Sequence, residues 1–206
     1  MNLLGKSNRR ARGAARGVAL ALLTLLALVM AGCGYNEVVD RDEAVKASWA
    51  EVQNQYKRRA DLVPNLVKTV KGAAQFEQDT LQKVVEARAK VGSMQVDSSI
   101  IDNPERLKQF EQAQGQLSGA LSRLLVVSEK YPELRATEGF RDLQSQLEGT
   151  ENRIAVARKR YIDSVAAYNV VVLHFPTSLG AKARGMAVRP TFEGTPGQEN
   201  PPAVDL

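Results

Sequence analysis

Apolar residues recur along this 206-residue chain at intervals of three, four and seven, which is the spacing of one face of an α-helix. The first series consists of Val38, Val45, Trp49, Val52 and Tyr56. A second series, with polar interruptions, consists of Val63, Leu66, Val70, Ala73, Leu81, Val84 and Val91. Each series predicts helical structure with one face packed against other helices.

Pro64 lies where the first series gives way to the second. A proline inside a helix removes a hydrogen bond and costs about 3 kcal/mol, whereas in a first turn it costs little. We therefore predict a turn at residues 59–61, with Asp61 as the N-cap of the next helix. The spacing nearly keeps its phase across Pro64, so one kinked helix is the alternative.

A turn at this point gives the basic residues beside it a candidate role. It would expose Lys57, Arg58 and Arg59 at one end of the molecule, with Asn65 nearby. These four residues are a candidate interaction surface for acidic partners or lipid head groups. The alternative is structural, because cations in the last turn of a helix stabilise its C-terminus by about 0.3–1 kcal/mol each.

A third helix is predicted to begin at residues 102–105, where polar capping residues precede a proline in the first turn. Residues 92–101 before it are predicted to form a loop. The inward face of this helix consists of Leu107, Phe110, Gln114, Leu117, Leu121, Leu124 and Ser128. Pro132 sets its end, because the residue before a proline avoids helical geometry.

The fourth series is the longest and ends at Phe175-Pro176. Its members are Phe140, Leu143, Leu147, Thr150, Ile154, Ala157, Tyr161, Val165, Tyr168 and Val172. Four amphipathic helices with short connections predict an all-α fold, an antiparallel up-down four-helix bundle. Beyond Gly180 the chain is rich in proline, glycine and polar residues, so it is predicted to be disordered, with a contact at Phe192.

Polar residues interrupt the fourth helix near its middle. Thr150 lies on the inward face, and Glu151, Asn152 and Arg153 follow it. Together with Glu77 they are a candidate interhelical polar layer that fixes the register of the helices. The alternative is a functional groove, which would require a cavity lined by Glu77, Thr150 and Asn152.

Charge is distributed unevenly between the N-terminus and the rest of the chain. The formal net charge is +5, but residues 1–32 contain five basic residues and no acidic one, which leaves 23 of each in the remainder. The remainder is therefore neutral. The basic patch that nucleic-acid binding requires is absent from the sequence pattern, so no nucleic-acid partner is expected.

The N-terminus resembles a bacterial export signal. Basic residues precede an apolar run from Val18 to Met30, and Ala31-Gly32 stand directly before Cys33, the only cysteine. This arrangement is similar to a lipobox, which predicts lipidation of Cys33, cleavage after Gly32 and a lipid-anchored body outside the cytoplasm. The alternative is an uncleaved single-pass signal anchor in the inner membrane.

The sequence contains few of the residue combinations that catalytic sites require. His174 is the only histidine, and with one cysteine neither a Cys/His metal site nor a Cys-His catalytic pair can be assembled within one chain. The Glu-x-x-His pairs of carboxylate-bridged metal sites and glycine-rich phosphate loops are also missing from the sequence. We expect no enzyme activity and no cofactor.

Several longer segments resemble the LemA family of bacterial envelope proteins. They are Gly34-Tyr35-Asn36, KRRADLVPNLVKTVKG, YPELRATEGFRDLQSQLEGTENRIAVARKRYIDSVAAYN and Phe175-Pro176. The resemblance spans about Tyr35 to Phe192 and implies a helical bundle behind a membrane-targeting segment. One departure is AAQFEQ, where Phe76 stands in place of a histidine typical of the family, so a ligand role for that histidine cannot apply.

Three parts follow from these patterns: a signal peptide or anchor at 1–32, a LemA-like helical bundle at 33–178 and a flexible tail at 179–206. The function they favour is a non-enzymatic, membrane-anchored interaction or scaffold protein of the bacterial envelope, with protein partners. The alternative is a ligand-binding or lipid-sensing module with a pocket between helices. The sequence does not determine the oligomeric state.

Overall fold

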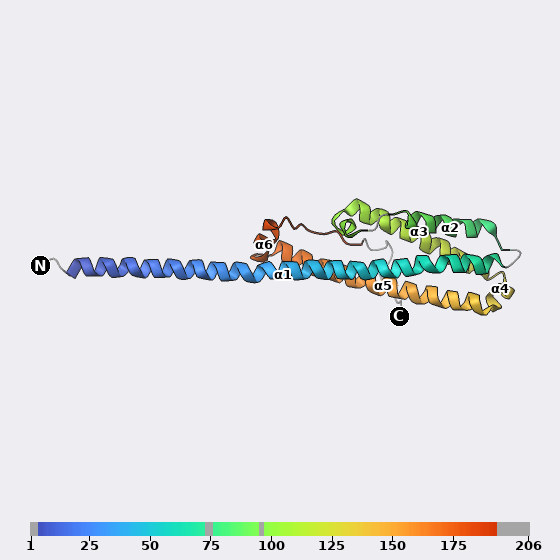
Figure 1. Ribbon diagram of the computed structural model, residues 1–206, viewed down its shortest axis with the longest axis horizontal. Coiled ribbons are helices and arrows are strands. Elements are labelled where there is room, and N and C mark those ends of the chain that lie inside the picture. The colour runs from blue at the N-terminus through green and yellow to red at the C-terminus, as the bar shows by residue number, and fades with distance from the viewer. Residues whose placement is uncertain (1–3, 73–75, 95–96, 193–206) are drawn as a thin grey trace, which may run out of the picture. The chain divides into compact units, whose positions relative to one another are not determined.

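The computed structural model describes residues 4–72, 76–94 and 97–192, and for residues 4–35 and 98 it describes the backbone alone. Every regular element in these residues is a helix, which confirms the all-α class (Figure 1). The elements are α1 (Leu4–Lys71), α2 (Gln78–Gly92), the 3-10 helix η1 (Ser98–Asp102), α3 (Pro104–Ser128), α4 (Pro132–Ala136), α5 (Glu138–Leu173) and α6 (Thr177–Ala183).

The chain divides into two compact units, which are described separately. The first consists of residues 1–43 and 167–188, and the second of residues 44–166 and 189–206. Helices α1 and α5 each contribute residues to both units.

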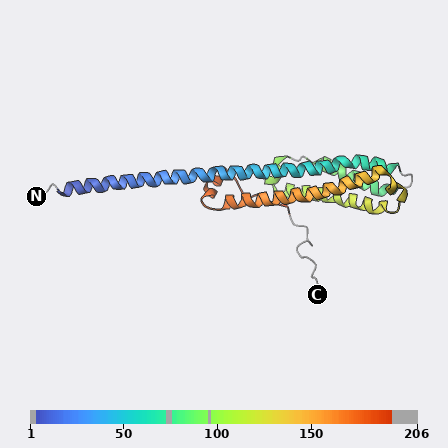
Figure 2. The same cartoon turned by 90° about the horizontal axis from the view of Figure 1, so that it is seen from below.

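One hydrophobic cluster in the second unit draws residues from α1 to α5, and α2 and α3 lie side by side (Figures 1 and 2). The described members of the four predicted inward faces are buried, apart from Val91, which is partly buried. The three-four spacing therefore predicted the core correctly. Members of this cluster that belong to the predicted inward faces are Val63, Leu66, Val70, Leu81, Val84, Leu117, Leu121, Leu124, Phe140, Leu143 and Leu147.

An aromatic cluster forms a second part of the core of this unit. The Trp49 ring lies 5.3 Å from the rings of both Phe110 and Tyr161, and 6.1 Å from that of Phe192. Trp49 is buried, as its place on the first series predicts. Phe192 is also buried, so the predicted contact at this residue is confirmed.

The turn predicted at residues 59–61 is wrong, because α1 continues through Pro64 to Lys71. Asp61 is an exposed residue inside this helix and not an N-cap. Pro64 has no N–H to donate to the carbonyl of Ala60, four residues earlier. Arg88 of α2 supplies the missing donor, since its Nε lies 3.1 Å from that carbonyl oxygen. The chain changes direction between α1 and α2 instead.

The boundaries of α3 and α5 follow the predicted signals. Asn103 is the N-cap of α3, and its side chain accepts a 3.1 Å hydrogen bond from the Arg106 N–H. Residues 92–101, predicted as a loop, include most of η1. The disorder predicted from Gly180 onward is wrong up to Phe192, because α6 passes through Gly180 and Tyr161 Oη donates to the Pro190 carbonyl.

The predicted signal and lipidation site fall where the structure describes no side chains. Cys33 lies within the backbone of α1, and its side chain is outside the described residues. Among the residues that are described, none of the helices combines the length and the apolar character that a membrane span requires.

Pro64 and Arg88 provide a test of how α1 tolerates its proline. We expect Pro64→Ala to stabilise the protein by less than the full cost of about 3 kcal/mol, because Arg88 already satisfies part of the broken bond. Arg88→Ala should cost about 0.5–1.5 kcal/mol in the parent protein and close to nothing in the Pro64→Ala background. Urea unfolding of the four proteins in this double-mutant cycle measures both values. An equal cost of Arg88→Ala in both backgrounds would contradict the proposed compensation.

Candidate functional site

Arg59 is the most unusual residue in the core of the second unit. It lies on the inward side of α1, three residues after Tyr56, and only 1% of it is exposed. A charged side chain is almost never buried to this degree unless it is paired and hydrogen-bonded. The predicted exposure of Arg59 at one end of the molecule is therefore wrong, and the question becomes which groups hold its charge.

The Arg59 guanidinium is held by residues of two other helices. Nη1 donates to Glu151 Oε1 of α5 at 2.7 Å and to the Ser118 hydroxyl of α3. Nη2 donates to Gln114 of α3 twice, to its side-chain Oε1 at 2.6 Å and to its carbonyl oxygen at 3.1 Å. The guanidinium carbon also lies 5.0 Å from the centre of the Tyr56 ring. We call these five residues the arginine tie, because they join α1, α3 and α5.

One hydrogen-bond donor of the arginine tie has no acceptor among the described residues. Nε of Arg59 is buried without a hydrogen-bond partner in the structure. Glu151, in contrast, has 45% of its side chain exposed, so solvent screens the ion pair from one side. Removing the arginine side chain would leave the buried Gln114 amide without its partner, which is the costly way to break such an arrangement.

The other residues of the candidate basic surface lie elsewhere on α1. Lys57 and Arg58 are exposed, as predicted, and so is Asn65. The Asn65 carbonyl accepts a 3.0 Å hydrogen bond from Thr69 Oγ1. The structure therefore separates Arg59, which is buried, from the three exposed residues with which it was grouped.

The candidate polar layer is only partly brought together. Thr150 is buried, but its hydroxyl donates to the Gln146 carbonyl at 2.7 Å, within its own helix. Asn152 and Arg153 are exposed. Glu77 is exposed at the N-cap position of α2, and its Oε2 accepts a 3.0 Å hydrogen bond from Thr80. Of the predicted layer, Glu151 alone joins the arginine tie.

An open groove of about 500 Å³ borders the arginine tie between α3 and α5. Arg158 of α5 lies in it, donating to Glu111 at 3.0 Å and to the Tyr56 hydroxyl at 3.3 Å. Its guanidinium carbon stands 4.3 Å from the centre of the Phe192 ring. Burial raises the pKa of Tyr56, and the nearby positive charge of Arg158 opposes that rise. Neither Glu77 nor Thr150 lines this groove.

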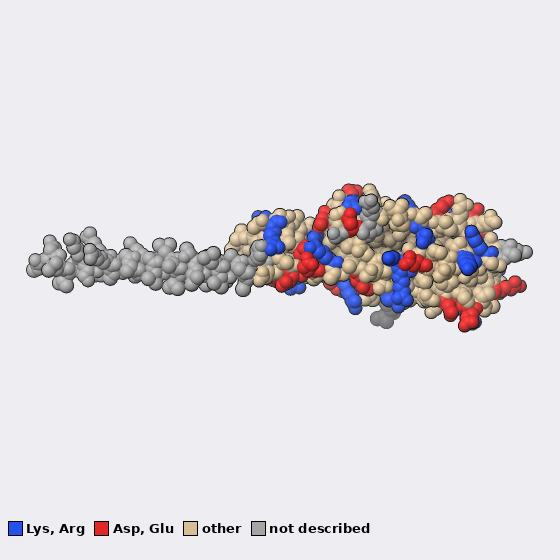
Figure 3. Space-filling model, viewed as in Figure 1, with Lys and Arg blue, Asp and Glu red and all other residues tan. Residues whose placement is uncertain are grey.

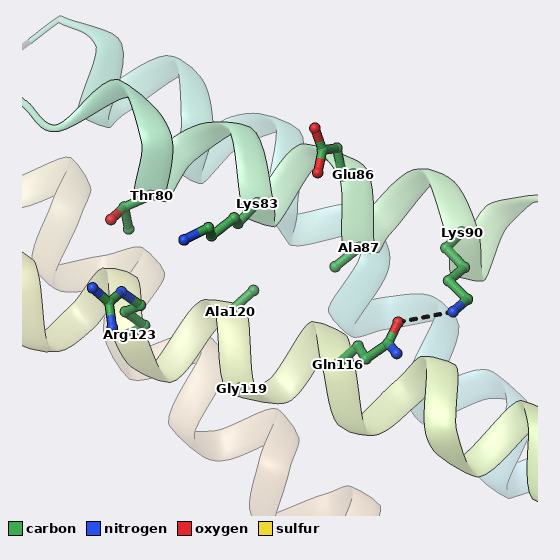
Figure 4. Close-up of a pocket in the computed structure, with 9 residues that line it drawn as sticks. All are labelled: Thr80, Lys83, Glu86, Ala87, Lys90, Gln116, Gly119, Ala120 and Arg123. Atoms are coloured by element: carbon green, nitrogen blue, oxygen red, sulfur yellow. Dashed lines mark hydrogen bonds between the residues drawn. The ribbon is translucent and has the colours of Figure 1, made fainter.

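A second open groove, of about 460 Å³, lies between α2 and α3 (Figure 4). Ala87 and Ala120 face each other across the middle of this groove, and Lys83 and Arg123 extend toward one end of it. Lys90 at the opposite end donates to Gln116 at 3.0 Å. For Lys83 and Arg123, no hydrogen bond or ion pair is found among the residues that the structure describes. We call this feature the α2–α3 groove.

Gly119 makes the α2–α3 groove shallow and accessible. A side chain placed at Gly119 would meet no atom within 4 Å, so the surface above it is open. Small residues at this position and at Ala87 and Ala120 let another helix approach the backbone closely.

Elsewhere on the visible surface, basic and acidic side chains are interspersed rather than gathered in one basic patch (Figure 3). Within the described ranges, no three His, Cys, Asp or Glu side chains are grouped so that they could hold a metal ion. His174 is exposed after the end of α5, and its Nδ1 donates to the Val170 carbonyl at 2.8 Å.

Sequence reasoning missed most of the arginine tie. Gln114 could have indicated a buried polar contact, because it is a polar residue on an otherwise apolar face and requires a hydrogen-bond partner when buried. Ser118 and Tyr56 carried no comparable signal. The partner of Gln114 was hidden by the expected turn, which placed Arg59 in solvent.

The second unit is thus an all-helical body with an arginine buried between its helices and open grooves on its surface. The sequence profile of the LemA family matches residues 48–206, so the chain belongs to the LemA family. The magnetosome protein MamQ of Magnetospirillum gryphiswaldense is 24% identical over 201 residues, covering 89% of this chain and 74% of its own length.

Two further relatives show the same degree of identity. The magnetosome protein MamQ 1 of Paramagnetospirillum magneticum is 24% identical over 183 residues, covering 81% of this chain and 67% of its own length. Protein LemA of Metamycoplasma hominis is 24% identical over 147 residues, covering 71% of this chain and 63% of its own length.

The arginine tie predicts unequal effects on stability at its two ends. Arg59→Ala should lower the free energy of unfolding by about 3–5 kcal/mol, because it empties the site of a large buried side chain and leaves the Gln114 amide without its partner. Glu151→Gln should lower it by about 1 kcal/mol or less, because the carboxylate is half exposed. Arg58→Ala, at the exposed neighbouring position, is the matched control and should change stability by about 0.5 kcal/mol at most. Comparable losses for Arg59→Ala and Arg58→Ala would contradict this assignment.

Tyr161 predicts a loss of stability at alkaline pH. Burial raises its pKa above the ordinary value of 10.0, so it stays protonated in the folded state while the unfolded chain ionises. The unfolded state is then favoured as the pH rises past that ordinary value, and stability falls. Thermal unfolding of the parent and of Tyr161→Phe over this range tests the effect. The slope should be shallower in the variant, and an unchanged slope would assign the loss to other groups.

Proposed function

We propose that this chain is a non-enzymatic, membrane-anchored scaffold protein of the bacterial envelope. In this proposal the body is an antiparallel four-helix bundle that binds protein partners through surface grooves. Membership of the LemA family supports the proposal, as do the export-like N-terminal sequence and the lipobox-like residues that precede Cys33. Two of the relatives bear the name of magnetosome proteins, which is compatible with a part in organising a cell structure.

The α2–α3 groove is the observation that carries the proposal. It combines a floor of small residues with two cations, Lys83 and Arg123, that lack partners among the described residues. An amphipathic helix with acidic residues on one flank fits such a groove, because binding would pair the cations and cover the alanine side chains. Interfaces of this kind gain specificity and association rate from the charge match.

Site-specific photocrosslinking in native membranes tests the groove. A benzophenone amino acid in place of Ala120 should give a covalent adduct of defined mass, whereas the same probe at the exposed Val156 of α5 should not. Lys83→Glu combined with Arg123→Glu should reduce the adduct yield about ten-fold, in the range expected for losing charge contacts at an interface. The same pair should change stability by about 0.5 kcal/mol or less, because both side chains are exposed. An adduct that survives the charge reversal, or forms equally at Val156, would contradict the proposal.

A ligand-binding module is the second candidate, and the groove between α3 and α5 favours it. That groove is of a size that small molecules occupy, and the unpartnered Nε of Arg59 lies in its wall. Its cation Arg158 is already engaged by Glu111 and Tyr56, however, so an anionic ligand would have to displace existing bonds. The α2–α3 groove imposes no such requirement, and for this reason we prefer the scaffold function.

A further inference from the structure

Exposed apolar side chains concentrate in the C-terminal segment of the first unit. Of the nine large hydrophobic residues that are strongly exposed in the described structure, five lie between residues 170 and 188. They are Val170, Leu173, Phe175, Leu179 and Val188, and we call them the apolar foot. Phe175 is 80% exposed and Leu173 is 66% exposed. Single exposed apolar residues are ordinary, but a concentration of this kind marks a binding surface.

The apolar foot is held in a defined conformation by the chain around it. The single hydroxyl proton of Thr177 is shared between the Val171 carbonyl, 2.6 Å from Oγ1, and the His174 carbonyl, 2.8 Å from it, which fixes the passage from α5 to α6. Farther on, Tyr168 Oη donates to the Ala187 carbonyl at 3.1 Å, which ties the segment after α6 back to α5. The apolar side chains are therefore presented by ordered backbone.

Opposite faces of the end of α5 have different roles. Val171 and Val172 are buried, whereas Val170 and Leu173 are exposed and lie three residues apart, on one face of the helix. Phe175 follows directly and Leu179 belongs to α6, where Ala181 is fully buried. One face of this end of α5 is therefore packed inward, while the other leaves apolar side chains exposed.

The charge of this segment favours one kind of partner. Residues 164–192 contain no aspartate or glutamate, and Lys182 and Arg184 of the α6 region are both exposed. The acidic residues of this unit that the structure describes, Glu37, Asp40, Asp42 and Glu43, all belong to α1. The C-terminal segment itself combines exposed apolar side chains with cations and has no acid of its own, which matches an anionic bilayer surface, where each nearby cation adds attraction.

The position of the foot in the chain matches the same partner. The first unit includes both this segment and the part of α1 that follows the apolar run Val18–Met30. Val38 is the first buried residue among the side chains that the structure describes, and eight helical residues at 1.5 Å each place it about 12 Å from Met30. A head-group layer is about 5–8 Å thick on each side of a bilayer, so this unit would begin close to the lipid surface.

From these observations we infer that the apolar foot docks on the surface of an anionic membrane. Phe175, Leu173 and Leu179 enter the head-group region, and Lys182 contacts lipid phosphate. The inference rests on the membrane anchoring in the proposed function and adds a second, peripheral contact to it. This contact would hold the first unit against the bilayer instead of leaving it on a free tether.

Depth-dependent fluorescence quenching of the full-length protein tests the inference. Phe175→Trp and, separately, Leu179→Trp are placed in vesicles of phosphatidylcholine and phosphatidylglycerol that carry doxyl-labelled lipid. The emission added by either new tryptophan should fall about two-fold relative to unlabelled vesicles, since an interfacial side chain lies within reach of the quencher. The native Trp49 is buried in the second unit, so the parent protein supplies the background.

The matched control is Val126→Trp, at an α3 position of the second unit that is 69% exposed. Its added emission should not be quenched. Replacing Lys182 with Glu should weaken the quenching at Phe175→Trp, and thermal unfolding of each variant checks that it is folded.

Co-sedimentation with the vesicles separates the two proposals. Protein that sediments, with quenching at both foot positions and none at the control, supports the foot. Protein that sediments while both foot probes stay unquenched overturns the foot and leaves the anchor standing. Protein that does not sediment at all overturns both the anchor and the foot.

Discussion

The burial of one positive charge constrains the helical body more than any other single feature. Arg59 is held by Glu151, Gln114 and Ser118, so α1, α3 and α5 must be in register for its donors to find acceptors. Apolar packing alone tolerates small slides of one helix along another. A slide that separated the buried guanidinium from its acceptors would leave a charge buried without partners, which is costly. The buried charge therefore favours one register of the three helices over others. The half-exposed Glu151 lowers the free-energy cost of burial, because one ion of the pair stays in contact with water.

The sequence predicted the core well and the break in α1 incorrectly. Three-four spacing identified buried positions such as Trp49 and Tyr161, because helix period and burial are directly related. The error at Pro64 arose because its local cost was weighed without the partner that reduces it. Arg88 is 24 positions farther along the chain, and no local pattern reveals that its Nε reaches the Ala60 carbonyl. The same error hid the arginine tie, since a turn at Arg59 would have put it in solvent.

The two proposed contact surfaces differ in chemistry. The α2–α3 groove has small residues beside two cations that have no partner in the described part of the chain, which suits an acidic helix. The apolar foot has large apolar side chains on ordered backbone, which suits lipid. Neither could be located from the sequence alone. Nothing in the sequence indicates the open space above Gly119, and the motif Phe175-Pro176 does not reveal that the Phe175 side chain is exposed. A LemA-family protein with both surfaces would present one unit to the membrane and the groove to a partner.

The burial of Arg59 is tested most directly by its side-chain NMR signals. In a spectrum of protein labelled with 15N arginine, a guanidinium held by Glu151, Gln114 and Ser118 should rotate slowly, so that its two Nη groups give separate signals. Its buried Nε proton should exchange slowly with water. The exposed Arg58 should show averaged Nη signals and rapid exchange in the same sample. Averaged Nη signals and rapid exchange for Arg59 as well would contradict the buried tie.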